Sequence, residues 1–122
     1  MVPVDLGKVF RRLNKRYFAG KVNATIEWGR TRPSCPAGRA SMSLASYTLE
    51  DHLIRINPVL DNEWVPRRFL DYVVYHEMLH AHLGLKRAYH SARFRKREGE
   101  FLYYHFAVSW MDANLARLLR SR

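Results

Sequence analysis

Residues 66–84 read PRRFLDYVVYHEMLHAHLG. Its apolar residues recur at the spacing of one face of an α-helix, at Phe69, Leu70, Val73 and Val74. Pro66 stands where helices tolerate proline, at their start, and Gly84 stands where helices commonly end. The pattern therefore predicts one long helix over about 66–83.

The same helix contains residues 76–80, which read HEMLH. His76 and His80 are four residues apart, so they lie on one face of the helix and both imidazoles can point at one zinc ion. Glu77 follows the first histidine, and its carboxylate is placed to take a proton from a water activated by the zinc. The pattern predicts a hydrolytic zinc site. The alternative is a pair of helix histidines bonded to other partners.

A catalytic zinc needs a third protein ligand and one open position. His90 is the leading candidate, because it lies beyond the predicted helix end and the chain can turn back under the metal. Glu100 competes from the next helix, and Glu98 is a weaker candidate of the same kind. His82 lies about 200° around the helix from His80 and should point away from the site.

The flanking segments predict an α+β fold in a single domain over residues 1–122. Asp5 and Gly20 are the expected limits of a first helix over 6–19. A strand is expected over 22–29 and a loop over 31–38, followed by an antiparallel hairpin of strands 39–48 and 52–57 with its turn at Glu50-Asp51. A further helix is expected from about Ser91, with Phe94, Phe101, Leu102 and His105 in register. A last helix is expected over about 108–119.

Charge is the strongest compositional feature, since the 122 residues carry a net charge of +10. Basic residues cluster between 84 and 97, where no acid interrupts them: Lys86, Arg87, Arg93, Arg95, Lys96 and Arg97. Such a surface is typical of proteins that bind nucleic acid, although a merely solvated basic surface is the alternative. No apolar stretch suits a membrane span and no signal peptide is evident, so we expect a cytoplasmic protein without a membrane partner.

Four segments carry a resemblance to a known family: YVVYHEMLHAHLG (72–84), HSARFRK (90–96), FRRLNKRYFAGKVNATIEWGR (10–30) and IRINPVLDN (54–62). The first two are similar to the H-E-x-x-H … H-[GS]-x-x-F pattern of SprT-like zinc metalloproteases, a group that includes Spartan and the related WLM and YgjP-type domains. The other two are similar to the opening helix and strand of that family and to a later strand end. The resemblance covers about residues 9–106.

The resemblance implies that His76, His80 and His90 bind one catalytic zinc ion and that Glu77 is the general base. It implies a zincin-like fold in which strand 39–48 borders the substrate cleft. The expected function is a zinc-dependent metalloendopeptidase that acts on proteins associated with nucleic acids. Since the chain has one cysteine, Cys35, we expect a minimal form without the four-cysteine zinc ribbon that many SprT-like proteins carry.

Two other functions compete with the peptidase. A metal-dependent endoribonuclease of the YbeY type uses three histidines, but its second and third histidines are closer together than His80 and His90. A non-enzymatic basic adaptor that binds nucleic acid is the other alternative. Cys35 is a candidate latency ligand for the zinc, against the default of a free thiol. Four residues remain unranked donors to a developing oxyanion: Tyr103, Tyr104, His105 and Arg93.

Overall fold

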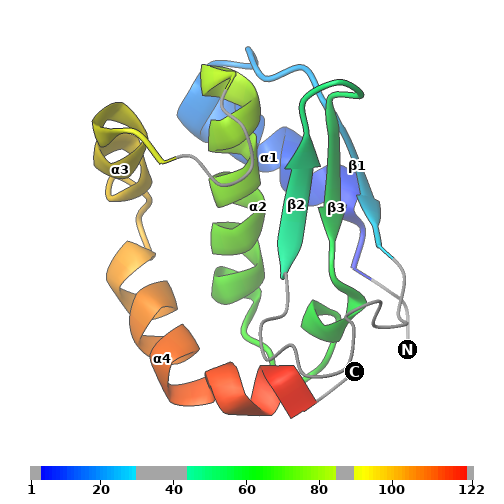
Figure 1. Ribbon diagram of the computed structural model, residues 1–122, viewed down its shortest axis with the longest axis vertical. Coiled ribbons are helices and arrows are strands. Elements are labelled where there is room, and N and C mark those ends of the chain that lie inside the picture. Colours follow the sequence, from blue (N-terminus) through cyan, green and yellow to red (C-terminus); the bar gives the residue numbers. More distant parts are fainter. Residues whose placement is uncertain (1–3, 30–43, 85–89, 121–122) are drawn as a thin grey trace.

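The computed structural model describes residues 4–29, 44–84 and 90–120. Its elements are α1 (Leu6–Phe18), β1 (Thr25–Trp28), β2 (Ala45–Thr48), β3 (Leu53–Ile56), a 3-10 turn η1 (Pro58–Leu60), α2 (Arg67–Leu83), α3 (Ala92–Glu98) and α4 (Tyr104–Arg120). Figure 1 shows α2 in the middle, with the sheet on one side and α3 on the other, while α4 runs from the α3 side past the lower end of α2. The predicted α+β class is confirmed.

Local capping explains where α1 begins and where α1 and α2 end. The Asp5 carboxylate accepts a hydrogen bond from the Lys8 backbone N–H at 3.2 Å, as expected of an N-cap. Helix α1 ends at Phe18, and Ala19 rather than Gly20 takes the first left-handed position, with φ of 53°. Helix α2 ends at Gly84, whose φ of 65° favours glycine. The long helix predicted from residues 66–84 is therefore confirmed.

The sheet has three strands in the order β1-β3-β2. Strands β2 and β3 pair antiparallel with Tyr47 opposite Ile54, which confirms the predicted hairpin. Strand β1 pairs parallel with the other side of β3. The described part of the predicted strand 39–48 is β2, whereas the predicted loop 31–38 and residues 39–43 lie outside the described residues.

The prediction of one helical register from Ser91 through His105 is wrong. Helix α3 ends at Glu98, and α4 begins at Tyr104, four residues before the predicted start at Val108. A tertiary hydrogen bond contributes to the break, because the Leu102 N–H donates to the Tyr17 hydroxyl at 3.2 Å instead of to a helix carbonyl. The sequence period cannot show this competition, because Tyr17 lies 85 residues away.

One hydrophobic core joins all these elements. Helix α2 contacts α1, α3 and α4 as well as strands β2 and β3. Its side chains from Phe69 to His80 are almost all buried, and Val74 and Met78 are fully so. Each fully buried aliphatic side chain contributes about 1.5–3 kcal/mol to folding. The helix that carries HEMLH is therefore packed into the core along most of its length. Within the described ranges, no helix is long and apolar enough to cross a membrane.

Candidate metal centre

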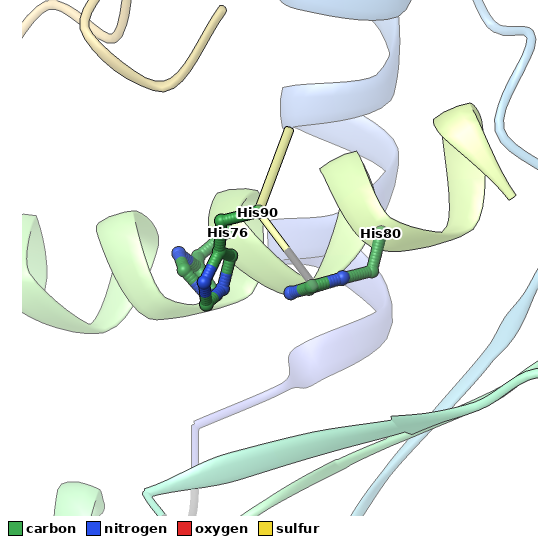
Figure 2. A group of neighbouring side chains, drawn as sticks. All are labelled: His76, His80 and His90. Atoms are coloured by element: carbon green, nitrogen blue, oxygen red, sulfur yellow. The ribbon is translucent and has the colours of Figure 1, made fainter. Parts of the chain in front are cut away.

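Three histidines converge beside the C-terminal half of α2. One ring nitrogen from each of His76, His80 and His90 lies within 4.8 Å of the other two. His76 and His80 come from successive turns of α2, and His90 comes from the segment just before α3 (Figure 2). His80 is fully buried, and the other two are half-buried. The structure thus brings together the three histidines that the sequence singled out.

The spacing of these nitrogens suits a metal ion. The Nε2 atoms of His76 and His90 are 3.3 Å apart. A tetrahedral zinc with Zn–N bonds of about 2.0–2.1 Å separates two ligand nitrogens by about 3.4 Å. Three imidazoles also suit copper, iron or nickel, so the donor set fits a transition metal without selecting one.

Phe94 forms an apolar wall against all three histidines. Its ring centroid lies 5.0 Å from that of His76, 4.6 Å from that of His80 and 4.8 Å from that of His90. Ser91 starts α3 by accepting a hydrogen bond from the Phe94 N–H at 3.1 Å, and the Phe94 side chain is fully buried. The N-terminal cap of α3 thus positions the Phe94 ring next to His90. Sequence reasoning placed Phe94 on a helix but missed this contact, because it depends on how α3 packs on α2.

Glu98, a candidate ligand from the sequence, instead contacts the outer face of His76. Its Oε2 atom lies 2.6 Å from His76 Nδ1, the ring nitrogen away from His90, and accepts a hydrogen bond from the Tyr72 hydroxyl at 2.8 Å. Burial opposes ionisation of this carboxyl, but the contacts with His76 and Tyr72 outweigh it, so the pKa of Glu98 is lowered. Burial beside this carboxylate also raises the pKa of Tyr72, which keeps its phenol protonated.

Glu100 does not reach the centre. It is about half exposed and pairs with Arg97 at 3.4 Å, on the same segment. Of the three residues considered as a third ligand, only His90 lies with His76 and His80 in the described part of the chain.

The remaining described histidines lie elsewhere. His82 packs against Phe18 with ring centroids 5.2 Å apart, in agreement with its predicted position away from the site. His52 contacts the Tyr47 hydroxyl at 3.0 Å, and His105 is exposed on α4. Burial lowers the pKa of His90, and the neighbouring His76 lowers it further, so the His90 imidazole stays neutral and able to bind a metal at neutral pH.

Glu77 lies between the two helix histidines in sequence and is buried, with 6% of its surface exposed. Buried carboxylates are uncommon unless they have a function or a partner. Its general-base role remains a prediction from the sequence.

The predicted basic surface is described only in part. Arg93, Arg95 and Lys96 are exposed on α3. Arg97 is half-buried and donates to the Tyr17 carbonyl at 3.3 Å, so its side chain connects α3 to α1. Lys86 and Arg87 lie outside the described residues, and so does the candidate latency ligand Cys35.

A buried helix bearing H-E-x-x-H, with a third histidine brought to it, is the arrangement expected of a metalloprotease-like domain. The SprT-like family model matches residues 6–103, most of the chain, and the protein therefore belongs to the SprT-like family. This match confirms the family that the sequence resembled. Searches of curated proteins and of solved structures find no match to the chain.

Proposed function

We propose that this protein is a zinc-dependent metalloendopeptidase. The observation that carries the proposal is the convergence of the His76, His80 and His90 nitrogens within 4.8 Å of one another. Glu77 follows His76 in sequence and is buried on α2. Three imidazoles with a fourth position open to solvent or substrate are the usual donor set of a catalytic zinc. Membership of the SprT-like family supports the same assignment.

In this proposal the residues have separate roles. The three histidines hold the ion, and Glu77 accepts the proton of the attacking water and then delivers it to the leaving amine. Zinc, when bound, polarises the scissile carbonyl and lowers the pKa of the attacking water.

Strand β2 is the proposed docking edge for an extended substrate. It lies at one edge of the sheet among the described strands, and it contacts α2. A peptide that pairs with a sheet edge gains main-chain hydrogen bonds whatever its side chains are. This mode of binding suits an endopeptidase that acts on unfolded segments.

Proteins associated with nucleic acids are the proposed substrates. The net charge of +10 and the exposed Arg93, Arg95 and Lys96 on α3 support this choice, because α3 follows directly after His90. Phosphate contacts from such residues would concentrate the enzyme where its substrates are bound, without any reading of base sequence.

The test is cleavage of an unfolded DNA-binding protein, followed by mass spectrometry, with and without single-stranded DNA. Zinc-loaded wild type is compared with Glu77→Gln and with the control Glu63→Gln, which changes an exposed glutamate away from the site. We expect cleavage by wild type and the control, and a loss of at least about 100-fold in Glu77→Gln.

Two results would contradict the proposal. Equal cleavage by wild type and Glu77→Gln would refute the role of Glu77 as general base. The absence of cleavage in every sample would refute the peptidase function. Chelator-sensitive cleavage of RNA by the same preparations would then favour the endoribonuclease. Stimulation by DNA that disappears when Arg93, Arg95 and Lys96 are changed to glutamine together would support the proposed class of substrates.

A further inference from the structure

The contact between His76 and Glu98 has a consequence for the metal centre. We propose that Glu98 is a positioning residue that fixes the ring orientation and tautomer of His76, so that Nε2 of His76 faces the metal. The inference rests on the proposed function only in taking His76 as a metal ligand. It assigns to Glu98 a role different from the direct ligation considered from the sequence.

The two ring nitrogens of His76 face different partners. Nδ1 lies 2.6 Å from Glu98 Oε2, whereas Nε2 lies 3.3 Å from Nε2 of His90. An ionised carboxylate only accepts hydrogen bonds, so a His76 ring that binds a metal through Nε2 carries its proton on Nδ1. The lone pair is then left on Nε2, directed toward the other histidines. A carboxylate behind a ligating histidine fixes the ring and raises its basicity in this way.

Glu98 cannot rotate freely out of this position, because its oxygen is held from a second side. The Tyr72 hydroxyl donates to the same Oε2 atom at 2.8 Å. Tyr72 lies one turn before His76 on α2, so both donors come from one face of the helix. Only 9% of the surface of Glu98 is exposed, and water has limited access to compete for the carboxylate.

The backbone that carries Glu98 is fixed independently of its side chain. The Tyr75 hydroxyl donates to the Arg97 carbonyl at 2.6 Å, and Arg97 Nη2 donates to the Tyr17 carbonyl at 3.3 Å. These bonds connect the end of α3 to α2 and to α1. The start of α3 meanwhile holds Phe94 against the three histidines. Helix α3 therefore supports the centre at both of its ends.

The experiment measures zinc affinity by competition with a chromophoric chelator, so it requires no peptidase activity. The variants are Glu98→Ala, Glu98→Gln and Tyr72→Phe, and the control is Glu100→Ala, which removes the same charge two residues away at an exposed position. We expect Glu98→Ala to lose about 10–100-fold in affinity, as do other changes behind metal-ligating histidines. Glu98→Gln, which still accepts a hydrogen bond, should lose less, and Tyr72→Phe should lose a few-fold. Glu100→Ala should match wild type.

A second readout reports on the His76 ring itself. In the cobalt-substituted protein, each ligating histidine with a protected N–H gives a shifted proton resonance that disappears in D2O. We expect the His76 resonance in wild type and in Glu100→Ala, and its loss by rapid exchange in Glu98→Ala. A merely structural role for Glu98 would leave this resonance in place in any variant that remains folded.

Three results would overturn the inference. The first is wild-type zinc affinity in Glu98→Ala, or in both Glu98→Gln and Tyr72→Phe if the alanine variant does not fold. The second is a loss of zinc affinity in Glu98→Ala as large as that in His76→Ala, a variant measured beside it, which would make Glu98 a ligand. The third is retention of the His76 N–H resonance in Glu98→Ala. Wild type that does not bind zinc would instead refute the proposed function, so the two failures are distinguishable.

Discussion

Replacement of Phe94 is the sharpest test of how the fold supports the metal centre. The side chain is fully buried and lies against His76, His80 and His90. Truncation of a buried phenylalanine to alanine costs about 3–5 kcal/mol in the free energy of unfolding, because transfer energy is lost and a cavity remains. Domains of this kind are stable by only about 5–15 kcal/mol, so Phe94→Ala should remove a large part of the total.

Phe94→Leu separates volume from ring contacts. Leucine fills most of the space, but the three ring contacts with the histidines are lost, so we expect a cost of about 1–2 kcal/mol. Phe106→Ala is the matched control, because 38% of the Phe106 surface is exposed on α4, and its cost should be below about 1 kcal/mol.

The assay is urea unfolding with excess chelator, which removes any contribution from bound metal. With a slope near 2 kcal/mol per molar urea, Phe94→Ala should lower the midpoint by about 2 M and Phe94→Leu by about 0.5–1 M. A midpoint change below about 0.5 M in Phe94→Ala, or a change in Phe106→Ala as large as that in Phe94→Ala, would refute the packing described for α3.

Three further predictions concern the metal and two local features. Saturating zinc should raise the melting temperature of wild type but not of His76→Ala, since an ion that binds only the folded state stabilises it; an equal rise in both, measured by differential scanning fluorimetry, would contradict the ligand set. Asn14→Ala should lower the free energy of unfolding by about 1–3 kcal/mol, because the Asn14 side chain donates to the Val22 carbonyl and accepts from the Val22 N–H, both at 3.0 Å. Asn23→Ala, at an exposed position, should change the free energy of unfolding by less than about 0.5 kcal/mol. Ala19→Gly should raise the free energy of unfolding by about 0.5–1 kcal/mol, because φ at Ala19 is 53° and glycine adopts this conformation without strain. Ala113→Gly inside α4 should lower the free energy of unfolding by a similar amount, and a change of the opposite sign in either variant, measured by chemical denaturation, would contradict the prediction.

Much of this site could be predicted from the sequence because it depends on local periodicity. Residues four apart on a helix share a face in any fold, so His76 and His80 followed directly from their spacing. His90 needed the resemblance to SprT-like proteins as well, since a loop can place it in many ways. The caps at Asp5 and Gly84 were equally local.

The role of Glu98 depends on packing that no local pattern encodes. Spacing alone made it a weak candidate for the metal itself. Its actual neighbours, Tyr72 and His76, lie 26 and 22 residues away, and they meet it because Tyr75 and Tyr17 fix the end of α3. The early end of α3 has the same kind of cause, the bond from Leu102 to Tyr17.

The zinc content of the purified protein and of its histidine variants, measured by mass spectrometry, tests the three-histidine metal centre itself. We expect one zinc per chain in wild type, and loss of that zinc in His90→Ala. The control His82→Ala lies on the same helix as two of the ligands but packs against Phe18, so it should keep its zinc. Full zinc in His90→Ala, or equal loss in His82→Ala, would contradict the assignment of the centre.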